Sequence, residues 1–201
     1  MILAHGTGQG MGSEFMEYFA KGLAGQGLRS ARFEFPYMRE TGRDGKRRPP
    51  DREPVLRAAW QQAIGQVVHD GASRDRLIIG GKSLGGRIAS LVADDEKPAR
   101  LICLGYPFHP PGKPERLRTA HLEEIQTPTL ICQGIRDSFG NEEDVSSYRL
   151  STQIRFCWLP DGDHGFKPRK ASGLTREHNW DLALQRIAEF VRARSENRCQ
   201  L

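Results

Sequence analysis

What the chain has little of limits its functional class. No run approaches the ~20 apolar residues that a membrane helix needs. The opening MILAHGTGQG has neither the basic start nor the long apolar stretch of a signal peptide. The 201 residues include four cysteines but no Cys-x-x-Cys pair, which argues against a zinc or redox motif. Cys103, Cys132 and Cys157 lie in apolar runs and Cys199 near the end, a pattern typical of free thiols in a reducing compartment. We therefore predict a cytoplasmic protein with no membrane contact, no metal and no cofactor.

Aromatic residues are also few, at 8%, and none lies in the most basic segment, Arg39 to Arg52 (RETGRDGKRRPPDR). Without aromatics to stack on bases, and with Pro49 and Pro50 side by side, this segment is typical of a solvated loop, and its composition argues against a nucleic-acid partner. Much of the net charge of +5 lies here. We expect Arg47 and Arg48 to favour the capture of anionic small-molecule substrates.

Short apolar runs alternate with amphipathic ones along the whole chain. The predicted strands are residues 2–5, 31–35, 77–80, 101–104, 129–132 and 154–159, and the predicted helices are residues 13–27, 53–69, 83–94, 141–149 and 177–194. This alternation predicts an α/β fold, a doubly wound and mostly parallel sheet of about six strands, as one domain over residues 1–201. In such sheets, ligands bind at the carboxyl ends of the strands.

The strongest chemical signal is the segment GGKSLGG at residues 80–86, which contains G-x-S-x-G as Gly81, Ser83 and Gly85. It follows a predicted strand and opens a predicted helix, the context in which this motif presents a nucleophilic serine on a sharp turn. The small neighbours let other backbone pass close by, and the helix N-terminus stabilises a developing oxyanion. The alternative is a glycine-rich turn in which Ser83 only caps the helix.

A nucleophilic serine needs a base, and His164 is the best placed of the six histidines. It lies in the turn-rich segment LPDGDHGF, after the last predicted strand and before the last helix. His109 follows an earlier strand and is expected near the pocket instead. His121 and His178 fall in segments that read as helix.

The acid that orients the base is expected at Asp137, which follows the predicted strand 129–132. Asp161 and Asp163 are close to His164 in sequence, which makes it hard for them to reach the far side of its ring. Asp144 is expected on a helix. Asp137 is therefore the preferred partner.

The oxyanion of an acyl intermediate needs two backbone N–H donors. Leu84, directly after the nucleophile, is one candidate. Thr7, in the glycine-rich segment HGTGQGMG after the first strand, is the second, with Gly8 as its alternate. The same glycines fit a dinucleotide fingerprint only loosely, and Phe35 stands where an acidic ribose ligand would be needed.

Several segments together resemble one family: HGTGQGMGSEFM, FEFPYM, GGKSLGGRIAS, LICQGIRDSFG and DGDHGFK. They are similar to small bacterial α/β-hydrolase-like proteins, related to animal testis-expressed hydrolase-like proteins and more distantly to dienelactone hydrolases. The resemblance implies the α/β-hydrolase fold and a triad of Ser83, Asp137 and His164. Dienelactone hydrolases carry cysteine at the nucleophile position, so their activity is not implied. Only four residues precede His5, so we expect a shortened first strand.

The connection between the fourth and fifth predicted strands, residues 105–128, is too short for a large lid. We expect an open site rimmed by aromatic and apolar side chains: Tyr37, Met38, Tyr106, Phe108 and His109. The function predicted is a serine hydrolase acting on an ester, thioester or small amide. The alternatives are a catalytically silent interaction module with this fold, or a nucleic-acid-associated protein that uses the basic segment.

Overall fold

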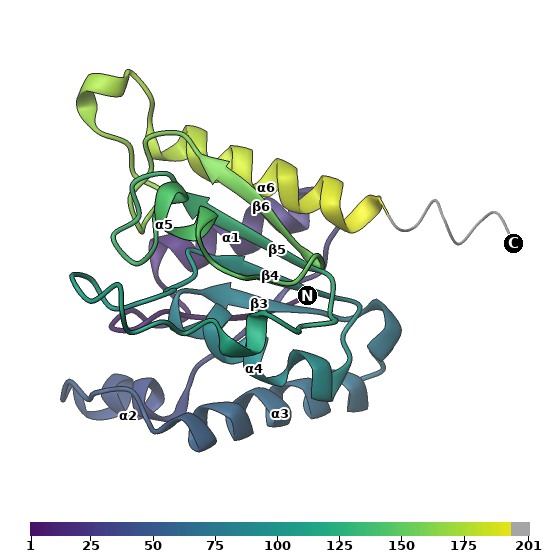
Figure 1. Cartoon of the computed structure of the whole chain (residues 1–201). Helices are drawn as coiled ribbons and strands as arrows, with labels where there is room; N and C mark the ends of the chain where they lie inside the picture. Colours follow the sequence, from purple (N-terminus) through teal and green to yellow (C-terminus); the bar gives the residue numbers. More distant parts are fainter. Residues whose placement is uncertain (194–201) are drawn as a thin grey trace, which may run out of the picture.

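The structure, a computed structural model, describes residues 1–193 and is built on a single parallel sheet (Figure 1). Its strands are β1 (Ile2–Ala4), β2 (Ala31–Phe33), β3 (Ile78–Lys82), β4 (Arg100–Leu104), β5 (Thr129–Gly134) and β6 (Ile154–Leu159), in the order β2-β1-β3-β4-β5-β6. Every neighbouring pair is parallel. The predicted fold class is confirmed. The order in which strands are added to the sheet reverses between β1 and β3, so the loops after these two parallel strands lead to opposite sides and leave room for a ligand.

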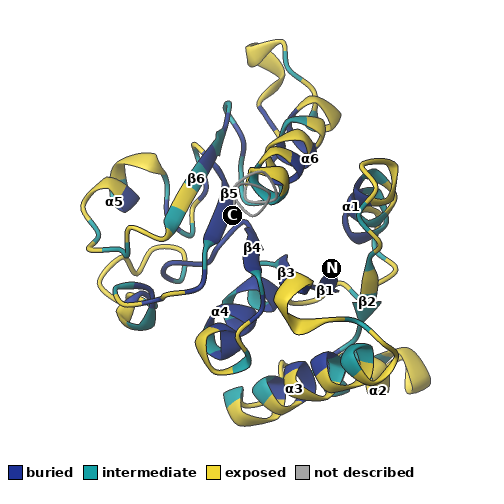
Figure 2. Ribbon diagram, turned by 90° about the vertical axis from the view of Figure 1, so that its right-hand side faces the viewer, coloured by how far each residue is buried: buried dark blue, intermediate teal, exposed yellow. Residues whose placement is uncertain are grey.

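Helices cover both faces of the sheet (Figure 2). The four longest are α1 (Glu14–Gly25), α3 (Glu53–His69), α4 (Leu84–Glu96) and α6 (Arg176–Arg192). Strand side chains alternate between two cores: Leu3 packs in the core that includes α1 and α6, whereas Ile2 and Ala4 pack in the core that includes α3 and α4. Burial on both faces explains why the strands are nearly all apolar.

The basic segment differs from the expectation. Its first part belongs to a helix, α2 (Pro36–Asp44), rather than to a loop. Pro36 occupies the first turn, where a missing N–H costs nothing, and Gly45 ends the helix with a φ of 73°. Arg48 is bonded to Asp44 at 2.6 Å and lies 3.1 Å from Glu40. Part of the positive charge that the sequence suggested is therefore already neutralised by ion pairs.

The remaining elements are short and leave the site uncovered. Residues 105–128 contain only the 3₁₀ turn Ala120–Leu122, and α5 (Glu142–Ser146) follows β5. Within residues 1–193, no helix has the length and hydropathy needed to cross a bilayer. Cys103, Cys132 and Cys157 are free and buried, and Cys199 lies outside the described residues.

Gly85 allows α4 to approach β1 very closely. A Cβ atom at this position would lie 2.7 Å from the His5 carbonyl oxygen and nearer still to that of Ala4. Backbone atoms on both sides cannot move aside without shifting β1 or the start of α4. Gly85 is thus a condition for placing the first turn of α4 beside the loop after β1.

We expect Gly85→Ala to lower the free energy of unfolding by about 1–3 kcal/mol, because it overpacks the interior, and to lower activity as well. Gly65→Ala is the matched control, since Gly65 is exposed on α3 and nothing lies within 4 Å of an added Cβ. It is expected to stabilise the protein by roughly 0.5–1 kcal/mol. Urea unfolding of both variants measures the difference, and equal stability of the two would contradict the close approach.

Candidate active site

Ser83 lies on a strained turn between β3 and α4. Its φ is 49° and its ψ −112°, a conformation that non-glycine residues rarely adopt. Such a residue costs about 1–3 kcal/mol and persists only where the surroundings hold it. Here its N–H donates to the Leu104 carbonyl at 3.0 Å, and its own carbonyl accepts the Arg87 N–H at 2.9 Å. The turn lifts the hydroxyl out of the sheet at the carboxyl end of β3.

The loop after β6, residues 160–167 and called here the histidine loop, brings His164 to this hydroxyl. His164 Nε2 lies 2.9 Å from Ser83 Oγ, and His164 Nδ1 lies 2.8 Å from Asp137 Oδ2. Because a carboxylate only accepts hydrogen bonds, Nδ1 carries the proton and Nε2 is free to accept the serine proton. The three residues that the sequence singled out thus form one hydrogen-bonded line.

Asp137 is fully buried, and the groups that contact its carboxylate are all hydrogen-bond donors. Its Oδ1 accepts the Phe139 N–H at 2.9 Å, and its Oδ2 accepts Gln133 Nε2 at 2.9 Å as well as the His164 ring. Gln133 is itself fixed, because its Oε1 accepts the Tyr106 N–H at 2.7 Å. The carboxylate is held in a single orientation, with one oxygen aimed at the imidazole.

The competing carboxylates have structural partners instead. Asp163 Oδ1 accepts the backbone N–H groups of Gly165 and Lys167 at 2.8 and 2.9 Å, which closes the histidine loop. Asp161 lies 2.9 Å from Arg136 Nε. Asp144 completes a capping box at the start of α5. Among the described residues, none of the three carboxylates is hydrogen-bonded to the His164 ring.

The predicted oxyanion donors lie next to the nucleophile. Thr7 and Leu84 both line the same cavity as Ser83, and neither backbone N–H has an acceptor within the described chain. The loop of Thr7 is fixed by His5, whose Nε2 accepts the Phe35 N–H at 3.1 Å and whose Nδ1 donates to the Gly6 carbonyl at 2.8 Å. Burial lowers the pKa of His5, which keeps it in this neutral form. Two free donors near a nucleophile form the geometry that stabilises an acyl oxyanion.

Lys82 also lies at the site, although its sequence position did not single it out. It occupies the variable position before Ser83, and its Nζ donates to the His164 carbonyl at 2.6 Å. Its ammonium group lies 5.5 Å from the ring centres of Phe15 and Phe166. Burial lowers the pKa of Lys82 to about 8, an effect that Asp137 and Asp163 partly oppose.

Lys82 also influences the base electrostatically. Burial and then the positive charge of Lys82 lower the pKa of His164, while Asp137 acts in the opposite direction. A lowered pKa keeps the imidazole neutral, and only the neutral ring can accept the proton of Ser83. The acid limb of a pH–rate profile is therefore expected at a pH below the ordinary pKa of histidine.

We expect Lys82→Met to lower kcat about tenfold to a hundredfold, because the histidine loop loses its anchor. The acid limb of kcat/KM should also move to higher pH, since the charge that disfavours the imidazolium is gone. Lys167→Met is the matched control: Lys167 also lines the cavity, but its side chain is exposed and makes no recorded bond to His164. If both variants shift the acid limb equally, the specific role of Lys82 is wrong.

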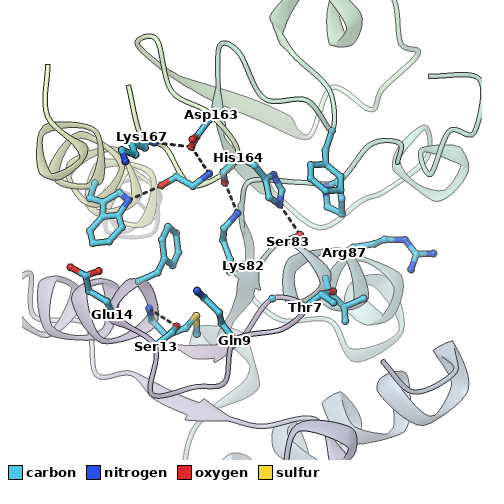
Figure 3. Close-up of a pocket in the computed structure, with 18 of the residues that line it drawn as sticks. Thr7, Gln9, Ser13, Glu14, Lys82, Ser83, Arg87, Asp163, His164 and Lys167 are labelled. Atoms are coloured by element: carbon cyan, nitrogen blue, oxygen red, sulfur yellow. Dashed lines mark hydrogen bonds between the residues drawn. The ribbon is translucent and has the colours of Figure 1, made fainter. Parts of the chain in front are cut away.

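Ser83 and His164 line a cavity of about 860 Å³ (Figure 3). At one end, α1 and α6 supply Phe15, Met16 and Trp180. Arg87 lies on the other side of Ser83 from Glu14 of α1 (Figure 3), and Arg118 lines the cavity close to Arg87. This volume is in the range of small-molecule sites.

The five side chains expected to rim the site do not line this cavity, and that expectation is corrected. Tyr37, Tyr106, Phe108 and His109 are buried, and Met38 lines a separate hollow beside α2. Tyr106 and Phe108 follow β4, but the chain turns inward at Gly105, whose φ is 69°. Their rings, 4.8 Å apart, therefore pack in the core with α3 and α4.

Among residues 1–193, no group of three or more histidine, cysteine, aspartate or glutamate side chains is arranged to hold a metal ion. His164 contacts Asp137 with one ring nitrogen and Ser83 with the other. Cys103, Cys132 and Cys157 lie in the core. The described site is built from side chains and backbone donors of the chain itself.

A family model described as an alpha/beta hydrolase domain matches residues 1–192. No curated protein matches the chain. Among solved structures, an alpha-beta serine hydrolase homologue from Coxiella burnetii has 24% identity and a TM-score of 0.68, with 94% of this chain and 81% of that chain covered. An α/β serine hydrolase without lid from Xanthomonas campestris has 20% identity and a TM-score of 0.65, covering 95% and 81%.

A third structure, the esterase domain of a Rhodothermus marinus protein, has 16% identity and a TM-score of 0.63, with 95% of this chain and 85% of that chain covered. At these identities the likeness concerns the fold alone.

Proposed function

Because the chain belongs to the alpha/beta hydrolase domain family, we propose that it is a serine hydrolase that cleaves an ester, thioester or small amide through an acyl-enzyme on Ser83. The observation that carries the proposal is the unbroken line from Asp137 to His164 to Ser83, with contacts of 2.8 and 2.9 Å. A buried carboxylate, a neutral imidazole and a strained serine meet where two N–H donors are free.

The reaction follows from these positions. Ser83 Oγ attacks the substrate carbonyl while His164 Nε2 takes its proton, and Asp137 stabilises the resulting imidazolium. The tetrahedral oxyanion accepts hydrogen bonds from the N–H groups of Thr7 and Leu84. As the intermediate collapses, the imidazolium gives its proton to the leaving group. Water then attacks the acyl-serine with His164 as base and releases the acid and free Ser83.

The alternatives have less support. A silent interaction module has no need for a strained Ser83 at a φ of 49° and for free donors beside it. A nucleic-acid role through the basic segment is weakened because Arg48 is engaged with Asp44 and Glu40. A hydrolase, in contrast, needs the strained serine and the free N–H donors together.

A fluorophosphonate probe tests the proposal directly. It reacts only with a serine that is activated by a base, and it leaves a stable phosphonyl group. We expect one labelled peptide, containing Ser83, after digestion and mass spectrometry. The absence of label on Ser83 in the folded protein, or equal label on several serines, would contradict the assignment.

A further inference from the structure

Arg87 lies one turn of α4 beyond the nucleophile. Its N–H donates to the Ser83 carbonyl at 2.9 Å, and residues four apart share one face of a helix. Both side chains line the same cavity. Figure 3 shows the guanidinium group of Arg87 on the side of Ser83 away from Glu14 and Lys167. A substrate on Ser83 that extends in this direction meets Arg87.

The donors of Arg87 are only partly used. One Nη2 contact of 3.0 Å joins it to Glu53 Oε2, at the start of α3. Its Nε is buried and has no hydrogen-bond partner among the described residues. Buried donors without partners are uncommon in folded proteins, because an unpaired buried donor loses its hydrogen bonds to water. Arg87, which lines the cavity, therefore has donor capacity that its contact with Glu53 does not use.

Arg118 also lines the cavity, from the connection between β4 and β5, and is close enough to Arg87 to be affected by its charge. Its backbone is anchored on both sides: its N–H donates to the Phe108 carbonyl at 2.8 Å, and its carbonyl accepts from Tyr106 Oη at 3.0 Å. Its side chain is half-buried and makes no ion pair with any residue that the structure describes. An anchored arginine without a carboxylate partner is available to a ligand.

The two arginines are close enough to affect each other. Burial and then the positive charge of Arg87 lower the pKa of the Arg118 guanidinium. The same positive charge, after burial, lowers the pKa of the nearby His121 to about 4, so that ring adds no charge near neutral pH. Glu53 is the one carboxylate that pairs with Arg87 in the described chain. Two cations facing one anion leave this end of the cavity with an excess positive charge.

The other basic groups around the cavity do not compete for an anion equally well. Lys82 also lines the cavity, but its Nζ donates to the His164 carbonyl at 2.6 Å, and burial lowers its pKa to about 8. Arg176 is bonded to Glu14 at 2.6 Å and to Glu177 at 2.9 Å. Lys167 is exposed, so its charge is screened by salt. Of the basic segment, only Pro50 reaches the cavity wall. The end formed by Arg87 and Arg118 is thus the anion-selective part of the cavity.

We propose that Arg87 and Arg118 bind a carboxylate of the substrate, so that the enzyme prefers small esters or thioesters carrying a negative charge on the side that extends along α4. The proposal rests on the hydrolase function argued above. A planar guanidinium matches the two oxygens of a carboxylate and forms charge-assisted hydrogen bonds. The apolar remainder of the substrate packs against Phe15 and Trp180 at the opposite end.

Matched ester pairs test the proposal on either side of the scissile bond. The acetyl esters of 4-hydroxybenzoate and 4-hydroxybenzamide place a charge, or a neutral amide of the same shape, on the leaving group. The p-nitrophenyl monoesters of adipic acid and adipamic acid place it on the acyl group. For at least one pair, we expect the wild-type kcat/KM to be higher for the anionic ester.

Loss of a charge-assisted hydrogen bond typically costs about tenfold to a hundredfold. Arg118→Gln and Arg87→Gln should therefore lower the anionic-to-neutral ratio of kcat/KM by about that factor.

Glu53→Gln should raise the ratio, because it frees Arg87, whereas a purely structural Arg87–Glu53 pair predicts no increase. Arg47→Gln is the control: the sequence suggested anion capture by Arg47, but this residue is exposed and does not line the cavity, so its loss should leave the ratio unchanged. The contrast should persist at high salt because both guanidinium groups are partly buried.

The outcomes separate the two proposals. Unchanged ratios in both arginine variants, or a ratio that falls in Arg47→Gln instead, would overturn the carboxylate site while hydrolysis through Ser83 remains. Circular dichroism of each variant shows whether it is folded. Wild-type protein that hydrolyses none of the four esters and takes no fluorophosphonate label would instead refute the hydrolase function itself.

Discussion

Ser83→Ala is expected to lower kcat/KM for every hydrolysed ester by on the order of 10⁴- to 10⁶-fold, the usual cost of removing a triad nucleophile. The expectation follows from the contact of 2.9 Å between Ser83 Oγ and His164 Nε2. Without the hydroxyl, the base has no proton to accept and no acyl-enzyme forms. Steady-state hydrolysis of p-nitrophenyl esters measures the loss, and fluorophosphonate labelling at this site should disappear with it.

The fold should survive this change. Alanine meets the same backbone strain at a φ of 49° as serine does, so the free energy of unfolding should stay close to that of the wild type. Ser83→Gly is an informative companion, because glycine adopts this conformation without a Cβ penalty. It should be equally inactive but more stable by about 1–3 kcal/mol. An active Ser83→Ala protein would mean that another residue performs the attack.

The sheet and the order of the reactive residues could be predicted from the sequence because they depend on local patterns. Strands that alternate with helices predict parallel pairing, and parallel strands bring their carboxyl ends to one edge. Ser83, Asp137 and His164 each follow a different strand, and the structure places them together at that edge. Here the chain path alone decides which residues meet.

Side-chain direction was harder to predict. Tyr106 and Phe108 follow β4 as expected, but their orientation depends on Gly105 and on Gln133, which belongs to β5 and holds the Tyr106 N–H at 2.7 Å. No sequence pattern near Tyr106 predicts this contact with Gln133. The pair of Arg87 and Arg118 also joins residues from distant segments. Such contacts are set by packing, which a single sequence does not display.

The helix α2 is a different kind of error, since its signals were present. Pro36 suits the first turn of a helix, and Gly45 suits the position just after its end. Pro49 and Pro50, which favour a loop, lie in the part of the segment that follows α2 and is indeed not helical. Arg48, folded back onto Asp44 and Glu40, shows how charged residues of opposite sign can stabilise such a surface helix.

Asp137→Asn is expected to lower kcat by roughly 10⁴-fold, through the wrong histidine tautomer. Asn has one acceptor oxygen where Asp has two. If that oxygen faces the Phe139 N–H, the amide NH₂ group faces His164 Nδ1 and forces the ring proton onto Nε2, where it blocks the base. If the oxygen faces His164, the NH₂ group opposes the Phe139 N–H instead, and two donors meet in a buried site.

The control for this change is Asp163→Asn, on the histidine loop itself. Asp163 uses a single oxygen, Oδ1, to accept the N–H groups of Gly165 and Lys167, and the amide oxygen of Asn can accept both. Its loss of activity should therefore be small, within about tenfold, since both loop hydrogen bonds remain and only the minor electrostatic effect of Asp163 on Lys82 and His164 is lost. Measuring kcat for both variants on one ester decides the assignment. If Asp163→Asn were the more damaging change, the acid that orients His164 would have to be sought on its own loop, and the Asp137 contact of 2.8 Å would be only structural.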